Sequence, residues 1–281
     1  MGGEIIRIGI SDWSMHPSHT IVENNYFEQC SGEREIISNK SFYNIFRYNT
    51  FVECQGALTL RHGNYAEVYG NYFFGNNVEN TGGVRIIGEG HKVYNNYFQD
   101  LEGDDAFSAL SIMNGVPNSP LNRYFQVKNC IIAFNTFVNN RHSIEIGVGK
   151  DAEISLPPIN CTIENNIVYS TKGQLIKFID QPQNFSWEEN VFFGSNLGID
   201  KIDGITIGNP QFKKDGELFR PTNFELIEKK AIGEYEFVKD DIDGQLRPKI
   251  KSVGCDEISN EKIIRTPMNK NNTGPKWMKN E

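Results

Sequence analysis

The sequence predicts an all-β fold, a right-handed single-stranded parallel β-helix, because one short pattern repeats along it. An asparagine, then any residue, then an apolar residue occurs seven times at regular places before residue 200. The repeated asparagines are Asn25, Asn49, Asn71, Asn96, Asn135, Asn166 and Asn190. Their intervals are 24, 22, 25, 39, 31 and 24 residues, so four of the six match one short coil of three strands. No segment before residue 200 shows the periodicity of a long amphipathic helix.

The repeated triplet has a physical reason in a stacked solenoid. Equivalent residues of neighbouring coils lie about 4.8 Å apart, so asparagine side chains can hydrogen-bond from coil to coil as a ladder. We also expect these asparagines to adopt the left-handed backbone of tight turns. The apolar residue two positions later is expected to point inward and stack on its counterpart. A β-sandwich repeats its strands too, but it gives no reason for Asn and Phe to keep register over seven repeats.

The remaining organisation follows from this repeat. Short alternating runs at 21–23, 57–60, 84–87 and 144–146 are the predicted strands. The two widest intervals, Asn96 to Asn135 and Asn135 to Asn166, predict inserted loops that overhang a groove. Residues 1–257 are interpreted as the β-helix domain, closed by 241–257, and residues 258–281 as a loosely held tail. Because residues 2–9 resemble a strand from the middle of a solenoid, an N-terminal cap is expected to be missing.

Composition excludes several classes of function. The 281 residues are 38% hydrophobic and include no run of about eighteen apolar residues, so no transmembrane helix and no membrane partner are expected. The first residues lack the basic and then apolar pattern of a signal peptide. A net charge of -8 argues against nucleic acid as a partner, although it allows a local basic cleft. Five cysteines without metal-site spacing predict buried thiols.

A pair of carboxylates marks the first candidate site. Glu33 and Glu35 are two residues apart in a predicted strand, so they face the same side and repel each other unless a cation lies between them. Ca²⁺ is one candidate, because it takes oxygen ligands. Neutralisation by Arg34 or Lys40 on the protein surface is the other, and the residues alone leave both open.

Cationic residues follow at intervals of about one coil. Arg61 lies 21 residues after Lys40, and Arg85 lies 24 residues after Arg61. Carboxylates beside a lysine and two arginines suggest a groove that binds an acidic ligand such as a polyanionic sugar. Salt bridges from Arg61 and Arg85 to Glu33 or Glu89 would explain the presence of these arginines equally well.

These segments resemble polysaccharide lyase family six, which contains alginate lyases and the dermatan-cleaving chondroitinase B. The similarity rests on Glu-x-Glu-Ile-Ile-Ser-Asn-Lys-Ser from residue 33, Leu-Thr-Leu-Arg-His-Gly from residue 58 and Gly-Gly-Val-Arg-Ile-Ile-Gly-Glu-Gly-His from residue 82. It continues through the segments that start at residues 108 and 241 and covers most of the chain. It implies a pectate-lyase-like β-helix, β-elimination in a uronic-acid polymer, and a secreted or periplasmic location.

The resemblance also implies roles for the matching residues. Lys40 would take the C5 proton of the uronate, and Arg61 would act as acid or charge stabiliser toward the leaving oxygen. Glu33 and Glu35 would hold Ca²⁺, which neutralises the substrate carboxylate. Arg85 would contact the carboxylate of a neighbouring sugar.

Other expectations concern the metal and the substrate. The family's third metal ligand, an asparagine, corresponds to Met1 here, so a weak metal site is expected. Alginate is the favoured substrate, with dermatan or chondroitin as the alternative and a truncated, non-catalytic glycan-binding solenoid as the rival interpretation. The further substrate-binding candidates are His62, His91, Asn114 and Tyr65. Strand alternation places His62 on the face opposite Arg61, where a supporting role fits as well. Arg123 and Tyr124 lie where a groove wall is expected.

Overall fold

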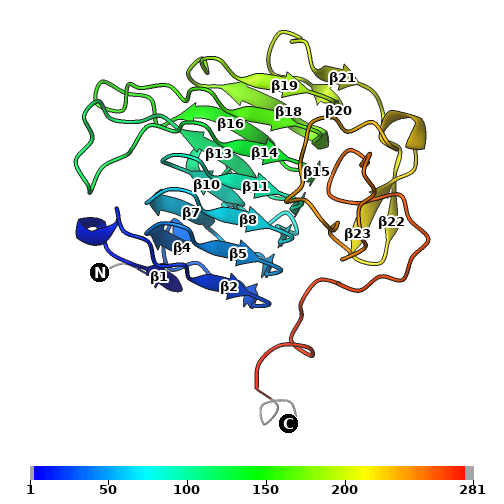
Figure 1. Cartoon of the computed structure of the whole chain (residues 1–281), viewed down its shortest axis with the longest axis horizontal. Helices are drawn as coiled ribbons and strands as arrows, with labels where there is room; N and C mark the ends of the chain where they lie inside the picture. The colour runs from blue at the N-terminus through cyan, green and yellow to red at the C-terminus, as the bar shows by residue number, and fades with distance from the viewer. Residues whose placement is uncertain (1–2, 276–281) are drawn as a thin grey trace.

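A computed structural model describes residues 3–275 and has the predicted architecture, a parallel β-helix (Figure 1). Sheet one contains β1 (Ile6–Ile8), β4 (Glu35–Lys40), β7 (Ala57–His62), β10 (Val84–Ile86), β13 (Leu110–Met113), β16 (His142–Val148) and the end of β18 (Ile167–Phe178). Sheet two contains β2 (Ile21–Glu23), β5 (Ile45–Arg47), β8 (Glu67–Tyr69), β11 (Lys92–Tyr94), β14 (Ile131–Ala133), β17 (Thr162–Glu164) and β19 (Ser186–Glu188). Sheet three contains β3 (Tyr26–Glu28), β6 (Thr50–Val52), β9 (Tyr72–Phe74), β12 (Tyr97–Gln99), β15 (Thr136–Val138), the start of β18, β20 (Asn190–Asn196) and β21 (Ile205–Ile207).

The asparagine ladder is confirmed. In each of the first six repeated asparagines, Nδ2 donates to Oδ1 of the asparagine one coil further on, at 3.0 Å. The same oxygen also accepts the backbone N–H of the earlier asparagine at 2.9–3.1 Å. The aromatic rings two positions later stack with centroids 4.6–4.8 Å apart: Phe27, Phe51, Phe73, Phe98 and Phe137. Register is therefore held by a polar ladder and an apolar stack together.

The left-handed backbone lies one residue before the ladder, which corrects our expectation. Asn24, Tyr48, Asn95 and Phe134 have φ between 52° and 58°, and Gly70 has φ of 64°. The ladder asparagines themselves lie outside the positive-φ region. Because tyrosine and phenylalanine occupy the strained position in some coils, the ladder needs asparagine for its side-chain amide and not for its backbone tolerance.

The outer face of sheet one carries a row of mostly polar residues in register. Ser38 pairs with Thr59, Thr59 with Arg85, Arg85 with Ser111, and Ser111 with Glu145. We call these five residues the outer row. Alternation points their neighbours inward, where residues such as Ile37 and Leu58 belong to the core. The short side chains of Ser38 and Thr59 leave room above them for longer side chains from the same strands.

The parallel coils end at β21, earlier than the boundary that we expected at residue 257. After β21, β22 (Phe212–Asp215) and β23 (Leu218–Pro221) form an antiparallel hairpin. The chain then folds back beside the coils, at the right of Figure 1. Residues 241–257 are therefore a lateral cover and not the last coils of the solenoid.

The C-terminal segment is held against earlier coils by specific hydrogen bonds. The hydroxyl of Tyr72 donates to the carbonyl of Ile242 at 2.8 Å. The N–H of Met268 donates to Oγ1 of Thr50 at 2.7 Å. The part of the predicted tail between 258 and 268 is thus attached, which corrects the expectation of a loose segment.

Two predictions from composition, one on membrane-spanning helices and one on the cysteines, can be compared with the structure. Within residues 3–275, no helix is long and apolar enough to cross a membrane. All five cysteines are free, four are buried and Cys30 is partly buried, which largely confirms the prediction of buried thiols.

Candidate functional site

One carboxylate and two guanidinium groups converge above sheet one. Glu35 begins β4, Arg61 lies near the end of β7, and Arg85 lies at the centre of β10. Nε of Arg61 is 3.6 Å from Oε1 of Glu35, and Nη1 of Arg85 is 3.8 Å from the same oxygen. Three successive coils thus bring these side chains together, as the spacing of the sequence predicted.

A loop from the first insertion covers the two arginines. This wall loop, residues 115–126, connects β13 and β14. The ring centroid of Tyr124 lies 4.3 Å from the guanidinium carbon of Arg61 and 5.5 Å from that of Arg85, within the range of cation–π attraction. Arg85 also donates to the Tyr124 hydroxyl at 3.3 Å. Arg61 donates to the carbonyls of Arg123 at 3.1 Å and Asn122 at 3.3 Å.

Lys40 ends β4 beside this cluster. It pairs in register with His62, the residue next to Arg61, and its side chain is partly exposed. With the residues of the described range 3–275, its ammonium group forms neither a salt bridge within 4.0 Å nor a hydrogen bond. The amine is therefore not engaged by any described residue.

The electrostatics of the cluster are unbalanced. Glu35 is only 8% exposed, yet its nearest cationic nitrogens are beyond hydrogen-bonding distance and no described residue donates a hydrogen bond to it. Its side chain is 10% exposed and its oxygens are not among the buried atoms without a partner, so solvent, a cation or a donor can still reach the carboxylate. Burial lowers the pKa of Arg61. The positive charges of Arg85 and Arg123 lower this pKa as well, whereas Tyr124 and Glu35 raise it.

The family model of chondroitinase B matches residues 1–236. The chain belongs to the chondroitinase B family. A solved mutant of AlyGC, an alginate lyase of polysaccharide lyase family 6, is 36% identical with a TM-score of 0.79, and the match covers 98% of this chain and 34% of that one. A mannuronic-acid-specific family 6 lyase from human gut microbiota is 35% identical with a TM-score of 0.57, over 69% of this chain and 44% of that one. This chain therefore spans less than half the length of either. Among curated proteins no match is found.

In this member of the chondroitinase B family, Glu33 and Glu35 provide carboxylate oxygens of the kind that a hard cation binds. Glu33 is exposed and accepts the N–H of Gly3 at 2.8 Å, while Glu35 lacks hydrogen bonds from the described residues. Carboxylate oxygens are ligands that Ca²⁺ prefers, so both side chains have suitable donor atoms. Glu33, however, lies on a bend before β4 and not in the strand, which corrects the expectation that alternation along one strand sets the pair on one face. Residues 3–275 contain no group of three or more His, Cys, Asp or Glu that could hold a metal, and Met1 lies outside them. A bound cation would need further oxygens from water or substrate.

His62 is a support for Arg61 and not an exposed substrate ligand. It is 1% exposed, and its Nδ1 lies 3.4 Å from Nη1 of Arg61. Burial, followed by the charges of Arg61 and Lys40, lowers the pKa of His62 to about 3. Its imidazole is therefore neutral near pH 7, where it can accept a hydrogen bond from the arginine.

The expectation that His91 contacts substrate is wrong, because the side chain is fully buried. Its Nδ1 accepts the N–H of Ala66 at 3.0 Å, and Nε2 lies 3.0 Å from the carbonyl of Ile87. Burial lowers its pKa to about 4. His91 therefore joins two coils from inside.

The other two substrate-binding candidates also have structural contacts. Asn114 is buried and donates to Asp180 at 2.9 Å, so it holds the base of the wall loop and does not line an open groove. Tyr65 is 40% exposed, but one ring face stacks on Tyr43 at 5.3 Å. Its other face lies on Gly90, where an added Cβ would be 2.4 Å from the ring. Neither ring face is therefore free to stack on a sugar, and contact of substrate with the exposed edge of Tyr65 stays a prediction.

Our reading of the sequence missed two residues near the cluster. Asn122 contacts Arg61 only through its backbone carbonyl, which no side-chain pattern can reveal. Glu153 forms a fork-like ion pair with Arg123 of the wall loop. It belongs to the second insertion, where it does not repeat in register with any other coil.

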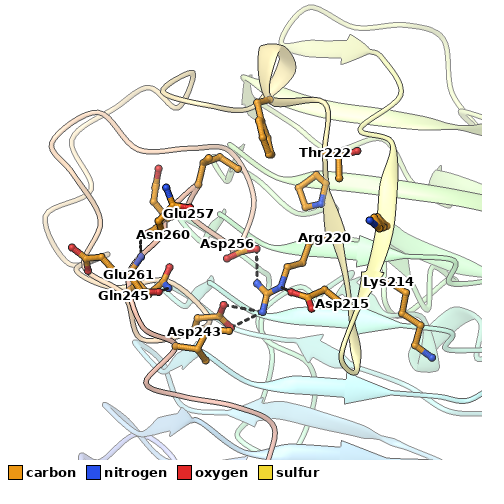
Figure 2. A pocket seen from close by; sticks show the side chains of 16 residues that line it. Lys214, Asp215, Arg220, Thr222, Asp243, Gln245, Asp256, Glu257, Asn260 and Glu261 are labelled. Carbon is orange, nitrogen blue, oxygen red and sulfur yellow. Dashed lines mark hydrogen bonds and ion pairs between the residues drawn. The ribbon is translucent and has the colours of Figure 1, made fainter.

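A separate cavity of about 740 Å³ lies beside the C-terminal segment. Figure 2 shows Asp215, Asp243 and Asp256 around Arg220, whose nitrogens lie 3.0, 2.8 and 2.6 Å from the three carboxylates. Because these charges satisfy one another, the cluster is suited to fastening the β22–β23 hairpin to the returning chain. Of the lysines that line the cavity, Lys213 and Lys214, neither forms an ion pair among residues 3–275.

Proposed function

We propose that this chain is a polysaccharide lyase that cleaves a uronic-acid polymer, alginate first, by β-elimination. The observation that carries the proposal is the convergence of Glu35, Arg61 and Arg85, together with Lys40, which pairs in register with His62 and forms no ion pair within residues 3–275. Identity of 35–36% to solved family 6 lyases, one titled an alginate lyase and one mannuronic-acid specific, supports it. An acidic polysaccharide also complements a cationic groove on a chain of negative net charge.

The proposed reaction starts with removal of the C5 proton. This proton becomes acidic when the charge of the adjacent carboxylate is neutralised, because the electrons of the intermediate gather on its oxygens. Lys40 Nζ accepts the proton. As the base, Lys40 acts through its neutral amine.

The C4–O bond then breaks. The electron pair left by the C5 proton forms the C4=C5 double bond, and the leaving oxygen takes a proton. Arg61 stabilises the charge on that oxygen and supplies the proton directly or through an ordered water. The burial that lowers the pKa of Arg61 favours this role. Arg85 would bind the carboxylate of a neighbouring sugar.

We propose further that Glu33 and Glu35 hold Ca²⁺. The bound ion would neutralise the uronate carboxylate. Glu35 would then exchange its weak pairing with two arginines for a direct ligand role. This assignment predicts that metal removal affects activity more than folding.

The deciding experiment incubates the chain with alginate, mannuronate-rich and guluronate-rich alginate, and dermatan sulfate, each with added Ca²⁺. Ultraviolet absorbance of the C4=C5 product is expected with at least one alginate. Product from dermatan sulfate alone would keep the lyase and change the substrate class. Binding of these polymers without product would overturn the lyase in favour of a glycan-binding solenoid.

A further inference from the structure

The two inserted loops are joined outside the coils. Arg123 of the wall loop donates to both carboxylate oxygens of Glu153, with Nε 2.9 Å from Oε1. At the base of the same loop, Gly115 and Leu156 form an antiparallel bridge with N···O distances of 2.8 and 2.9 Å. We call residues 149–157 the brace loop. Both loops extend from the coils at the left of Figure 1.

The brace loop presents Glu153 on an ordered turn. Oδ1 of Asp151 accepts the N–H of Glu153 at 2.7 Å and that of Ile154 at 2.6 Å, as in an Asx turn. These backbone hydrogen bonds lower the pKa of the Asp151 carboxyl, so the turn is formed by its ionised state. The backbone position of Glu153 is therefore fixed by hydrogen bonds within its own loop, independently of the ion pair with Arg123.

Arg123 connects the brace loop to the cluster. Its side chain binds Glu153, and its carbonyl accepts a hydrogen bond from Arg61. The only carboxylate within 4.0 Å of Arg61 among residues 3–275 is Glu35, at 3.6 Å and without a hydrogen bond. Besides His62, which lies 3.4 Å from Nη1, the groups that orient the Arg61 guanidinium are therefore the carbonyls of the wall loop and the ring of Tyr124.

We propose that Glu153 is a positioning residue for Arg61, acting through Arg123 and the wall loop. The proposal rests on the lyase function proposed above. When the Glu153–Arg123 pair is intact, the loop carbonyls hold Arg61 where it can face the leaving oxygen. When the pair is broken, the loop moves more freely and Arg61 loses its orientation. Because Arg61 acts on bond cleavage, kcat should fall more than KM rises.

Three variants test this clamp on the alginate reaction. Glu153→Gln removes the charge and keeps the shape, so kcat is expected to fall about three- to fivefold with KM changed less than about twofold, the scale of an exposed ion pair. The double variant Glu153→Arg with Arg123→Glu restores the pair in reverse and should recover most of kcat. The control is Glu23→Gln, which breaks the exposed Arg47–Glu23 pair on sheet two and should leave kcat unchanged.

Hydrogen exchange provides a readout that does not need turnover. The N–H of Val116 donates to the carbonyl of Tyr124 at 2.8 Å across the wall loop, and its exchange should accelerate in Glu153→Gln and not in Glu23→Gln. Unchanged exchange, unchanged kcat, or a loss that the reversed pair does not recover would each overturn the clamp. If the parent chain forms no unsaturated product from any polymer, the lyase proposal fails separately, and the exchange experiment still decides whether Glu153 holds the loop.

Discussion

The asparagine ladder and the outer row of sheet one lie on the same coils but differ in how their polar groups are hydrogen-bonded. In the ladder, every side-chain amide that bridges two coils donates to the next and to a backbone carbonyl, as Asn96 does with Asn135 and Val68. In the outer row, Oγ of Ser38, Nε of Arg85 and Oε2 of Glu145 are buried without a hydrogen-bond partner. The coil repeat therefore produces a fully paired ladder on one sheet and, on another, a row with three unpaired buried atoms, although Thr59 and Ser111 of that row have partners.

This difference separates stability from function. A buried polar group without a partner costs about 1–3 kcal/mol, so the outer row is expected to weaken the fold while the ladder strengthens it. Because Ser38 and Glu145 are fully buried, the groups that a ligand can reach are partly exposed side chains of the same strands, such as Arg61 and Lys40. Changes in the groove should thus affect activity with little effect on folding, and changes in the ladder should do the reverse.

The largest expected effect is on activity. Lys40→Ala removes the proposed base, and turnover should fall about 10³-fold, equivalent to about 4 kcal/mol of transition-state stabilisation. The free energy of unfolding in urea should stay within about 0.5 kcal/mol, because Lys40 is partly exposed and forms no ion pair within residues 3–275. Lys92→Ala on sheet two breaks a pair with Glu67 and serves as the control for loss of a lysine charge. Retained turnover in Lys40→Ala would remove it from the mechanism.

The next effect is on folding. Asn96→Ala in the middle of the ladder leaves the N–H of Asn71 and the carbonyl of Val68 without their partner, so the free energy of unfolding should fall by about 3 kcal/mol or more. The same change at Asn25, at the end of the ladder and partly exposed, should cost about 1 kcal/mol. Urea unfolding measures both. Equal losses at the two positions would contradict a ladder whose strength depends on burial.

Features that repeat in register could be predicted from the sequence. The ladder, the phenylalanine stack, and the meeting of Glu35, Arg61 and Arg85 all follow from residues spaced by about one coil. The contact of Arg61 with Arg123 could not be predicted, because the wall loop belongs to no repeat and reaches back to the cluster through a backbone carbonyl.

The predictions for His91 and for the end of the solenoid were wrong for related reasons. Gly88 and Gly90 have φ of 99° and 67°, and these two left-handed residues reset the inward and outward alternation before His91. The sequence suggested only that His91 lies at a turn near the groove, and spacing does not show which way the side chain of a turn residue points. Beyond residue 208, the hairpin and the returning chain are not periodic, so spacing carries no information on where they lie.

A third prediction concerns Glu35, which contacts Arg85 of the outer row and is a proposed ligand of the metal. Glu35→Gln should lower turnover about 10- to 100-fold, equivalent to about 1.4–2.7 kcal/mol, because the substrate carboxylate loses its neutralising cation. Added Ca²⁺ should raise the unfolding temperature of the parent by mass action and leave that of Glu35→Gln unchanged. Glu67→Gln on sheet two is the matched control. A rise with Ca²⁺ that is the same in the parent and in Glu35→Gln would place the ion elsewhere.

The last prediction tests the stability of the interior as the pH is lowered. His91 resembles the ladder in that both ring nitrogens contact the backbone, so protonation would remove the acceptor for Ala66. The pKa of His91 is lowered to about 4 in the folded chain, against about 6.5 when unfolded. The unfolded state therefore binds the proton first, and stability present above pH 6.5 is lost as pH falls toward 4, by at most about 1.4 kcal/mol per pH unit. Urea unfolding at several pH values should show a shallower loss in His91→Gln than in the parent. His16→Gln at an exposed position should follow the parent, and a His91→Gln slope equal to that of the parent would show that the acid sensitivity of the interior arises from other groups.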